Sequence, residues 1–159
     1  MTITAKQISH DMTLLLRQYF PVYYKNADIT EGFDRPCMTM EVATIRTGAA
    51  NDYFRHDFIP ITIYFFAEER TNGYADLLTV QETLRRLLES PLPLAGTYLY
   101  PPEPVEFSIV KEDGSLIASV EYEIYQRRPD SIDGNTPMHP DEPLNNEYME
   151  ELTINTELE

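Results

Sequence analysis

The sequence contains a single cysteine, no tryptophan and only six glycines among its 159 residues. One thiol, Cys37, cannot form an internal disulfide, so no oxidising compartment is implied, and we expect it to fill a strand or the core. The scattered glycines leave no phosphate-binding loop, no Gly-x-Ser-x-Gly nucleophile elbow and no dinucleotide fingerprint. The usual signatures of nucleotide-dependent enzymes and serine hydrolases are therefore absent.

Long apolar runs are also missing. No stretch approaches the roughly 18 to 20 residues that a membrane-spanning helix needs, and the N-terminus lacks a charged-then-apolar secretory pattern. We expect a soluble protein, cytoplasmic when made, with no membrane partner. The apolar fraction of 42%, with eleven Tyr and seven Phe, is enough for one globular core.

Basic residues are few: 12 Lys and Arg oppose 27 Asp and Glu, giving a formal charge of −15. Residues 129–159 hold nine of the acids and none of the bases, so the preceding 128 residues carry 18 acids and 12 bases, or −6. An acidic protein gains no affinity for nucleic acid from counterion release. DNA is therefore expected only as cargo that passes along a channel wall.

Groups that could carry chemistry are scattered. No two of the three histidines have metal-ligand spacing; they are His10, His56 and His139. The paired carboxylates Glu121 and Glu123 fall on the polar face of a predicted strand, where solvation is the ordinary interpretation. We expect no metal, no cofactor and no catalytic residue, and the chain is not predicted to be an enzyme.

The pattern predicts an α+β domain over residues 1–127, with a small, mostly antiparallel sheet, two helices on one face and a long hairpin arm. An acidic, proline-containing extension over 128–159 follows, disordered or ordered by a partner. A first helix is expected from Thr4, whose spacing to Gln7 suits a capping box, to Phe20-Pro21. Its apolar stripe comprises Ile8, Met12, Leu15, Leu16 and Tyr19.

Two long strands are predicted next, over 37–46 and 53–67, after a possible short strand at 22–25. In the second, both alternating faces are largely apolar, so something beyond the helices should cover the second face, and a neighbouring subunit is a natural candidate. Pro60 cannot donate to a ladder, which indicates a bulge or an edge at that point.

A second helix is expected after an N-cap at Asn72, and Pro91 stops it. Its apolar stripe comprises Leu77, Val80, Leu84, Leu87 and Leu88. The connector over 91–104 is predicted to be extended, with one short strand at most. A hairpin over 105–127 is predicted to turn at Asp113-Gly114 through a two-residue type I′ turn, which pairs Ile109 with Ala118.

The segment Thr47 to Phe58 joins the two long strands. It is either an ordinary hairpin loop or a projecting arm that contacts a neighbouring subunit, because Tyr and Arg are favoured in interfaces. A short apolar cluster in the extension, including Ile154, could also dock on a partner. The candidate interface residues are Arg46, Asn51, Tyr53, Phe54, Arg55, His56, Tyr64, Phe66, Tyr148, Met149 and Leu152.

Particular stretches resemble a family of phage and prophage tail terminator proteins from Gram-positive hosts, in siphovirus or myovirus tails. The residues that carry the likeness are Gly32-Phe33-Asp34-Arg35-Pro36 entering 37–42, Tyr53-Phe54-Arg55 leading into Ile61-Thr62-Ile63-Tyr64-Phe65, Val105-Glu106-Phe107, and 120–125. The likeness covers most of residues 4–127 and contains no catalytic motif.

This resemblance implies a subunit that assembles as a ring, typically a hexamer, on the last ring of tail tube protein. Such a ring would stop tube polymerisation and meet the head-tail connector protein at the head-proximal end of the virion tail. Two alternatives remain open from sequence: another head-tail joining or tail-assembly protein, and a non-viral adaptor that binds its partner through the cluster around Tyr148 to Ile154.

Overall fold

The computed structural model describes residues 3–25, 32–94 and 97–127. It has the predicted α+β architecture. The elements in order are α1 (Ala5–Tyr19), β1 (Cys37–Val42), β2 (Arg46–Ala49), β3 (Phe54–Phe66), α2 (Tyr74–Glu89), β4 (Leu92–Leu94), β5 (Thr97–Leu99), β6 (Glu106–Val110) and β7 (Ser115–Arg127). The extension predicted over residues 128–159 lies outside the described residues.

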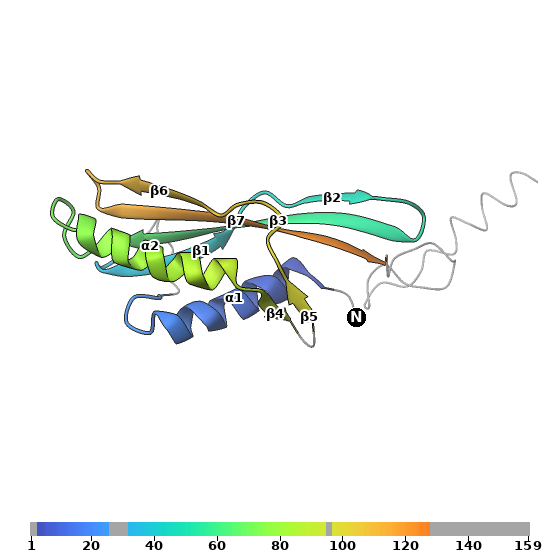
Figure 1. The fold of residues 1–159 in the computed structure, drawn as a ribbon, viewed down its shortest axis with the longest axis horizontal. Helices are drawn as coiled ribbons and strands as arrows, with labels where there is room; N and C mark the ends of the chain where they lie inside the picture. Colours follow the sequence, from blue (N-terminus) through green and yellow to red (C-terminus); the bar gives the residue numbers. More distant parts are fainter. Residues whose placement is uncertain (1–2, 26–31, 95–96, 128–159) are drawn as a thin grey trace, which may run out of the picture.

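Two long strands form the centre of a five-stranded antiparallel sheet (Figure 1). β3 and β7 have 13 residues each and pair along their whole length, from Phe54 opposite Arg127 to Phe66 opposite Ser115. β1 and β2 follow one another along the other edge of β3, and β6 pairs with the first part of β7. β4 and β5 make a separate two-stranded ribbon.

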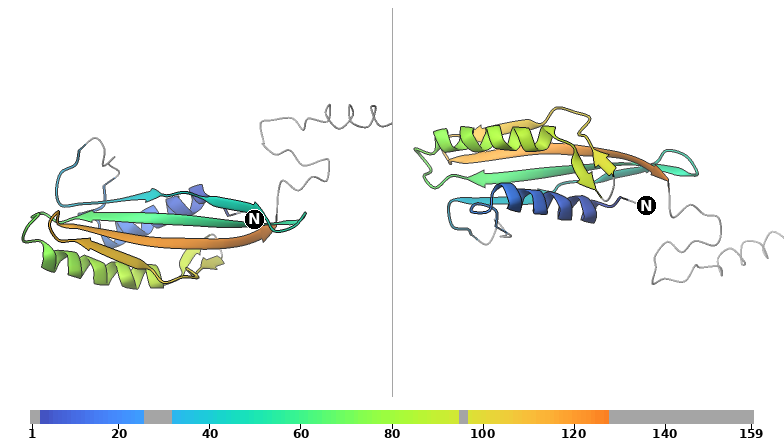
Figure 2. Two further views of the ribbon diagram at one scale, coloured as in Figure 1. Left: turned by 90° about the horizontal axis from the view of Figure 1, so that it is seen from above. Right: turned by 60° about the horizontal axis from the view of Figure 1, so that its bottom comes forward.

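Both helices lie on the same face of the sheet, as predicted, and the opposite face is open to view in Figure 2. Alternate residues of each strand point toward the helices and are buried, as the two-residue period of a strand requires. We call this the helix side and the other the open face. The helix-side core combines Ile8, Met12 and Leu16 of α1, the stripe of α2, Ile59, Ile61, Ile63 and Phe65 of β3, and Leu116, Ala118, Val120, Tyr122 and Ile124 of β7.

Helix α1 begins as predicted. The Thr4 hydroxyl accepts a hydrogen bond from the Gln7 amide at 3.2 Å, which satisfies one of the free N–H groups of the first turn. The stripe is narrower than expected because Tyr19 is 54% exposed. Leu16 and Phe20 are buried on either side of it, so the last turn still packs on the core and Tyr19 alone of the predicted stripe points away.

Helix α2 buries all five residues of its predicted stripe, but the predicted cap at Asn72 is wrong. The N-cap is Gly73, and no side chain caps the helix. A Cβ atom at this position would lie 2.5 Å from the Glu69 carbonyl oxygen and 2.6 Å from the Ala67 Cβ. Close packing against the preceding loop thus excludes a larger residue at the cap.

The hairpin of β6 and β7 has the predicted faces but a different register. Ile109 lies opposite Leu116 and Phe107 opposite Ala118, so the loop has four residues, Lys111 to Gly114, in place of two. A shift of two positions keeps every side chain on its predicted face. Gly114 (φ +61°) packs on the α2-preceding loop, and its carbonyl accepts a hydrogen bond from the Ala67 amide at 2.8 Å. This tertiary contact fixes the turn.

The predicted strand over 37–46 is divided into β1 and β2 by three residues. The division lies beside Pro60, whose carbonyl accepts a hydrogen bond from the Ala43 amide at 2.9 Å. Because Pro60 has no N–H, one backbone hydrogen bond is missing on this side of β3, and the neighbouring strand is interrupted between β1 and β2. The predicted short strand at 22–25 is only an isolated bridge between Tyr24 and Met38, and the connector contains two short strands, β4 and β5.

Candidate assembly surface

Where β3 begins and β7 ends, the sheet consists, among the described residues, of β2, β3 and β7, and we call this part the arm. The four residues of β2 are exposed, and β2 pairs with β3 from Arg46 opposite Phe58 to Ala49 opposite Arg55. The tip is fixed by Asn51, whose side-chain oxygen accepts hydrogen bonds from the amides of Tyr53 and Phe54 at 2.8 and 2.9 Å. This local turn sets the first residues of β3 in strand conformation.

Aromatic rings gather on the open face of the arm. Phe54 stacks on Tyr125 of β7 with ring centres 5.2 Å apart and planes 8° from parallel. The His56 ring lies 4.4 Å from Phe58 and 5.9 Å edge-on from Tyr125. Tyr53 and Tyr125 are 63% and 59% exposed, so these rings present apolar area to solvent.

Charged groups border these rings. The Arg46 guanidinium lies 4.5 Å from the centre of the Phe58 ring and 3.2 Å from the Glu121 carboxylate, so it combines a cation–π contact with an ion pair. His56 contacts the Glu123 carboxylate. An exposed patch of aromatic rings and Arg has the composition that is enriched at the energetic centres of protein interfaces.

Arg55 lies on the other side of the arm. Its Nε is 2.9 Å from the Asp57 carboxylate, but the N–H is not aligned with an acceptor, so the contact is an ion pair and not a hydrogen bond. Asp57 is only 5% exposed and also accepts hydrogen bonds from the Thr47 hydroxyl and, at 3.2 Å, the Gln126 side chain. Arg55 therefore neutralises a buried carboxylate inside the arm.

Tyr64 and Phe66 lie on the open face near the other end of β3. The Tyr64 hydroxyl donates a hydrogen bond to Glu41 at 2.6 Å, and this bond, with lesser contributions from burial and the carboxylate charge, raises the pKa of Tyr64. Phe66 is buried beneath the Phe33 ring, with centres 4.2 Å apart, and the Arg35 guanidinium. Phe66 is thus covered within the chain, whereas Tyr64 is half-buried.

Arg35, which belongs to the family-like stretch Gly32 to Pro36, links two distant segments of the fold. Its guanidinium donates to the carbonyls of Ala67 and Asp113 at 3.1 and 2.9 Å, which ties the end of β3 to the β6–β7 turn. No sequence pattern near Arg35 indicates these long-range acceptors. The remaining candidates, Tyr148, Met149 and Leu152, lie outside the described residues.

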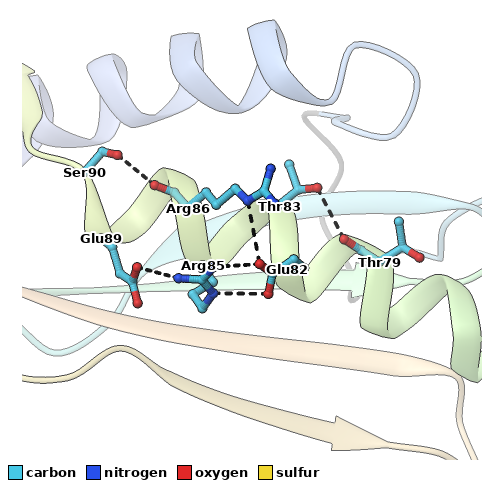
Figure 3. A network of polar contacts seen from close by, with 7 residues as sticks. All are labelled: Thr79, Glu82, Thr83, Arg85, Arg86, Glu89 and Ser90. Carbon is cyan, nitrogen blue, oxygen red and sulfur yellow. Dashed lines mark hydrogen bonds and ion pairs between the residues drawn. The ribbon is translucent and has the colours of Figure 1, made fainter.

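A second polar surface runs along α2 (Figure 3). Arg85 donates to Glu82 at 2.6 Å and to Glu89 at 2.7 Å, and these contacts raise the pKa of Arg85 and lower that of Glu82. Arg85 and Glu89 also line an open groove of about 460 Å³ against the proline-rich connector, with Tyr100 on its other wall. The Arg85 guanidinium is occupied by Glu82 and Glu89, so the one cation that lines this groove among the described residues is already paired.

Metal sites and membrane-spanning helices are two further features that bear on function. Within residues 3–25, 32–94 and 97–127, no three His, Cys, Asp or Glu side chains are placed to hold a metal ion. Over the same residues, no helix has the length and apolar character required to cross a membrane.

Comparison with known proteins gives one informative match. No curated protein matches the sequence. One solved structure shares 14% identity over 77% of this chain and 92% of its own, with a TM-score of 0.42, which is too low to carry an argument. A family model described as phage tail terminator protein matches residues 6–134, most of the sequence and nearly all of the described fold. The chain therefore belongs to the phage tail terminator family, a family of structural proteins of the bacteriophage tail.

Proposed function

We propose that this protein caps the phage tail tube as a homo-oligomeric ring, a hexamer, which ends tube polymerisation and forms the tail side of the head-tail joint. Family membership supports a role in ending the tail. The observation that carries the ring is the arm, which exposes stacked aromatic rings and Arg46 on a face that no helix of the described residues covers.

A ring also explains why the number of assembled subunits is limited. A repeated head-to-tail contact closes on itself when the rotation between neighbours divides the circle, and no enzyme is then needed to limit the number of subunits. The arm, with its exposed rings and Arg46, provides the self-contact. The remaining surfaces of the ring would meet the last ring of tail tube protein and the head-tail connector protein.

Charge suits the channel of such a ring. The 128 residues before the acidic extension carry a formal charge of −6 per subunit, so a ring of copies carries a net negative charge. DNA phosphates are repelled by such a ring and gain no counterion-release affinity for it. DNA would therefore pass through the channel as cargo and would not be retained there.

The test combines mass measurement with tube growth. Light scattering on the purified chain is expected to give one discrete mass near six subunits. When the tail tube protein of the same phage is polymerised, adding the chain is expected to stop growth, so that electron microscopy shows tubes of limited length with one capped end.

Matched variants locate the contact. Phe54→Ala removes a ring of the arm and is expected to weaken assembly, whereas Leu14→Ala removes an apolar side chain that is 51% exposed on α1 and leaves assembly unchanged. Tubes that keep growing in the presence of the wild-type chain would refute the capping role.

A further inference from the structure

In the part of the chain that the structure describes, one edge of the arm has no strand beside it. β7 runs from Ser115 to Arg127, but β6 pairs only with residues Ser115–Ser119. Among the described residues, no strand pairs with residues 120–127 of β7 on the side away from β3. The backbone groups along that side therefore form a free sheet edge.

The hydrogen bonds of β3 identify which groups point outward. The carbonyls of Pro60 and Phe54 bond to Ala43 and Ala50, so the even-numbered residues of β3 direct their backbone groups away from β7. The β3–β7 register is continuous, and backbone direction alternates along an antiparallel strand. The outward-pointing residues of the free edge are therefore Glu121, Glu123, Tyr125 and Arg127.

This edge lacks two of the features that commonly protect a sheet from unwanted pairing. Residues 120–127 contain neither Pro nor Lys, and their charged side chains are Glu121, Glu123 and Arg127, which favour a partner strand that carries a matching charge over indiscriminate pairing. The edge of β1 is covered, because Met38 exchanges backbone hydrogen bonds of 2.7 and 2.8 Å with Tyr23 and Lys25. The contrast marks the β7 edge as one that is left open for pairing.

A complementary edge lies on the opposite side of the same arm. Of the described strands, only β3 pairs with β2, and all four residues of β2 are exposed. By the same alternation, Thr47 and Ala49 direct their backbone groups outward. β2 carries Arg46, whereas the β7 edge carries Glu121 and Glu123, so the two edges have opposite charges in a strongly acidic chain.

We propose that the β7 edge of one subunit pairs with β2 of a second copy, so that the sheet continues from subunit to subunit around the ring. This inference rests on the proposed ring and names its contact. β2 and β7 both run antiparallel to β3, so rotation about an axis along the arm makes the joining pair parallel. Glu121, which pairs with Arg46 of its own chain, and Glu123, which contacts His56, then face the Arg46 of the neighbour.

Cross-linking between two single-cysteine variants tests the contact. Gly48→Cys and Tyr125→Cys place thiols on the open face at the two edges, and a Cβ at Gly48 meets nothing within 4 Å. With a short bismaleimide, a mixture of the two variants is expected to give a cross-linked dimer that neither variant gives alone. Wild-type chain, whose Cys37 is buried, is the control.

A second pair of variants tests the backbone. Tyr125→Pro removes an outward N–H and blocks strand addition, whereas Tyr125→Ala removes the same ring and keeps the N–H. Self-association of the Pro variant is expected to be at least ~10-fold weaker than that of the Ala variant, a difference of about 1.4 kcal/mol. Equal association of the two variants, each shown by circular dichroism to be folded, would overturn the proposal.

The cross-linking results separate this contact from the ring itself. Self-cross-linking of Tyr125→Cys alone would show a two-fold pairing of β7 edges and overturn the contact. A discrete ring in light scattering without the mixed cross-link would overturn the contact and leave the capping role standing. A mixed cross-link with no effect on tube growth would support the contact and refute the capping role.

Discussion

The side-chain amide of Gln126 pairs with both backbone groups of Ile3: it accepts from the Ile3 amide and donates to the Ile3 carbonyl, each at 2.8 Å. The amide side chain of Gln126 thus forms the two hydrogen bonds that a residue of a neighbouring strand would form, and it holds the segment before α1 against the arm. The same Gln126 nitrogen lies 3.2 Å from Asp57. The start of the chain and the interior of the arm are therefore joined through one residue.

Loss of this link should free the segment before α1. Gln126→Ala removes both partners of Ile3, so amide hydrogen exchange at Ile3 is expected to become faster while exchange in the core of β3 is unchanged. Gln7→Ala, which changes an amide side chain on α1, is the control. Unchanged protection of Ile3 in the Gln126 variant would argue against the role of the amide.

Asp57 should be the most sensitive carboxylate of the arm. Asp57→Ala leaves Arg55 without its ion-pair partner and removes the acceptor of the Thr47 and Gln126 hydrogen bonds. The free energy of unfolding is expected to fall by about 2–3 kcal/mol. This value is at the low end for breaking a buried pair because Arg55 is partly exposed. Urea unfolding measures this. Arg46→Ala, which breaks an exposed pair, should cost less than about 1 kcal/mol.

Gly114 should not tolerate a side chain. Its φ is +61°, and a Cβ would lie 2.9 Å from backbone atoms of Arg70 and Glu69, so Gly114→Ala is expected to lower the free energy of unfolding by more than about 1 kcal/mol. Gly48→Ala is the matched control, because nothing lies within 4 Å of its Cβ position. Equal thermal stability of the two variants would contradict the packing of the β6–β7 turn.

The thiol of Cys37 should be unreactive in the folded chain. Burial is the main cause that raises the pKa of Cys37, and its side chain is 1% exposed. Because the thiolate is the nucleophile, a chromogenic disulfide reagent at neutral pH is expected to react with Cys37 only after denaturant is added. Stoichiometric reaction without denaturant would contradict the burial of β1.

The hydrogen bond of Tyr64 to Glu41 predicts an alkaline dependence. The pKa of Tyr64 is raised in the folded state, so the stability it contributes is present below the ordinary tyrosine pKa of about 10 and is lost as the pH rises through the folded value. Spectrophotometric titration of Tyr64→Phe should show one fewer group titrating late. In Glu41→Gln, that group should titrate at lower pH.

The helices, the central strands and the two faces of the sheet could be predicted because they depend on local periodicity. The spacing of apolar residues in the sequence predicts both the buried stripe of α2 and the alternating faces of β3. The cap at Gly73 and the four-residue turn at Gly114 could not be predicted, because both are fixed by packing against the loop between β3 and α2. Local turn preferences favour a two-residue turn, and the tertiary contact overrides them.

Residue type selected the candidate interface residues, but it did not indicate on which face of the sheet each side chain lies. Arg46, Phe54, His56 and Tyr64 share the open face, as alternation along paired strands requires. Arg55 was grouped with them because Arg is favoured at interfaces, yet its odd position in β3 directs it to the buried Asp57. The free edge of β7 had no sequence signal, since it depends on how far β6 extends along its neighbour.

The pairing of β3 with β7 also sets the order in which the domain can be completed. Paired residues are separated by 49 positions at Phe66 and Ser115 and by 73 at Phe54 and Arg127. Contacts between such distant segments form late, because the loop between them must close first. On the ribosome, β7 is also the last strand of the domain to emerge. A nascent chain therefore lacks the complete arm until Arg127 has been synthesised, and the pairing of β7 with β2 that we propose would be restricted to finished subunits.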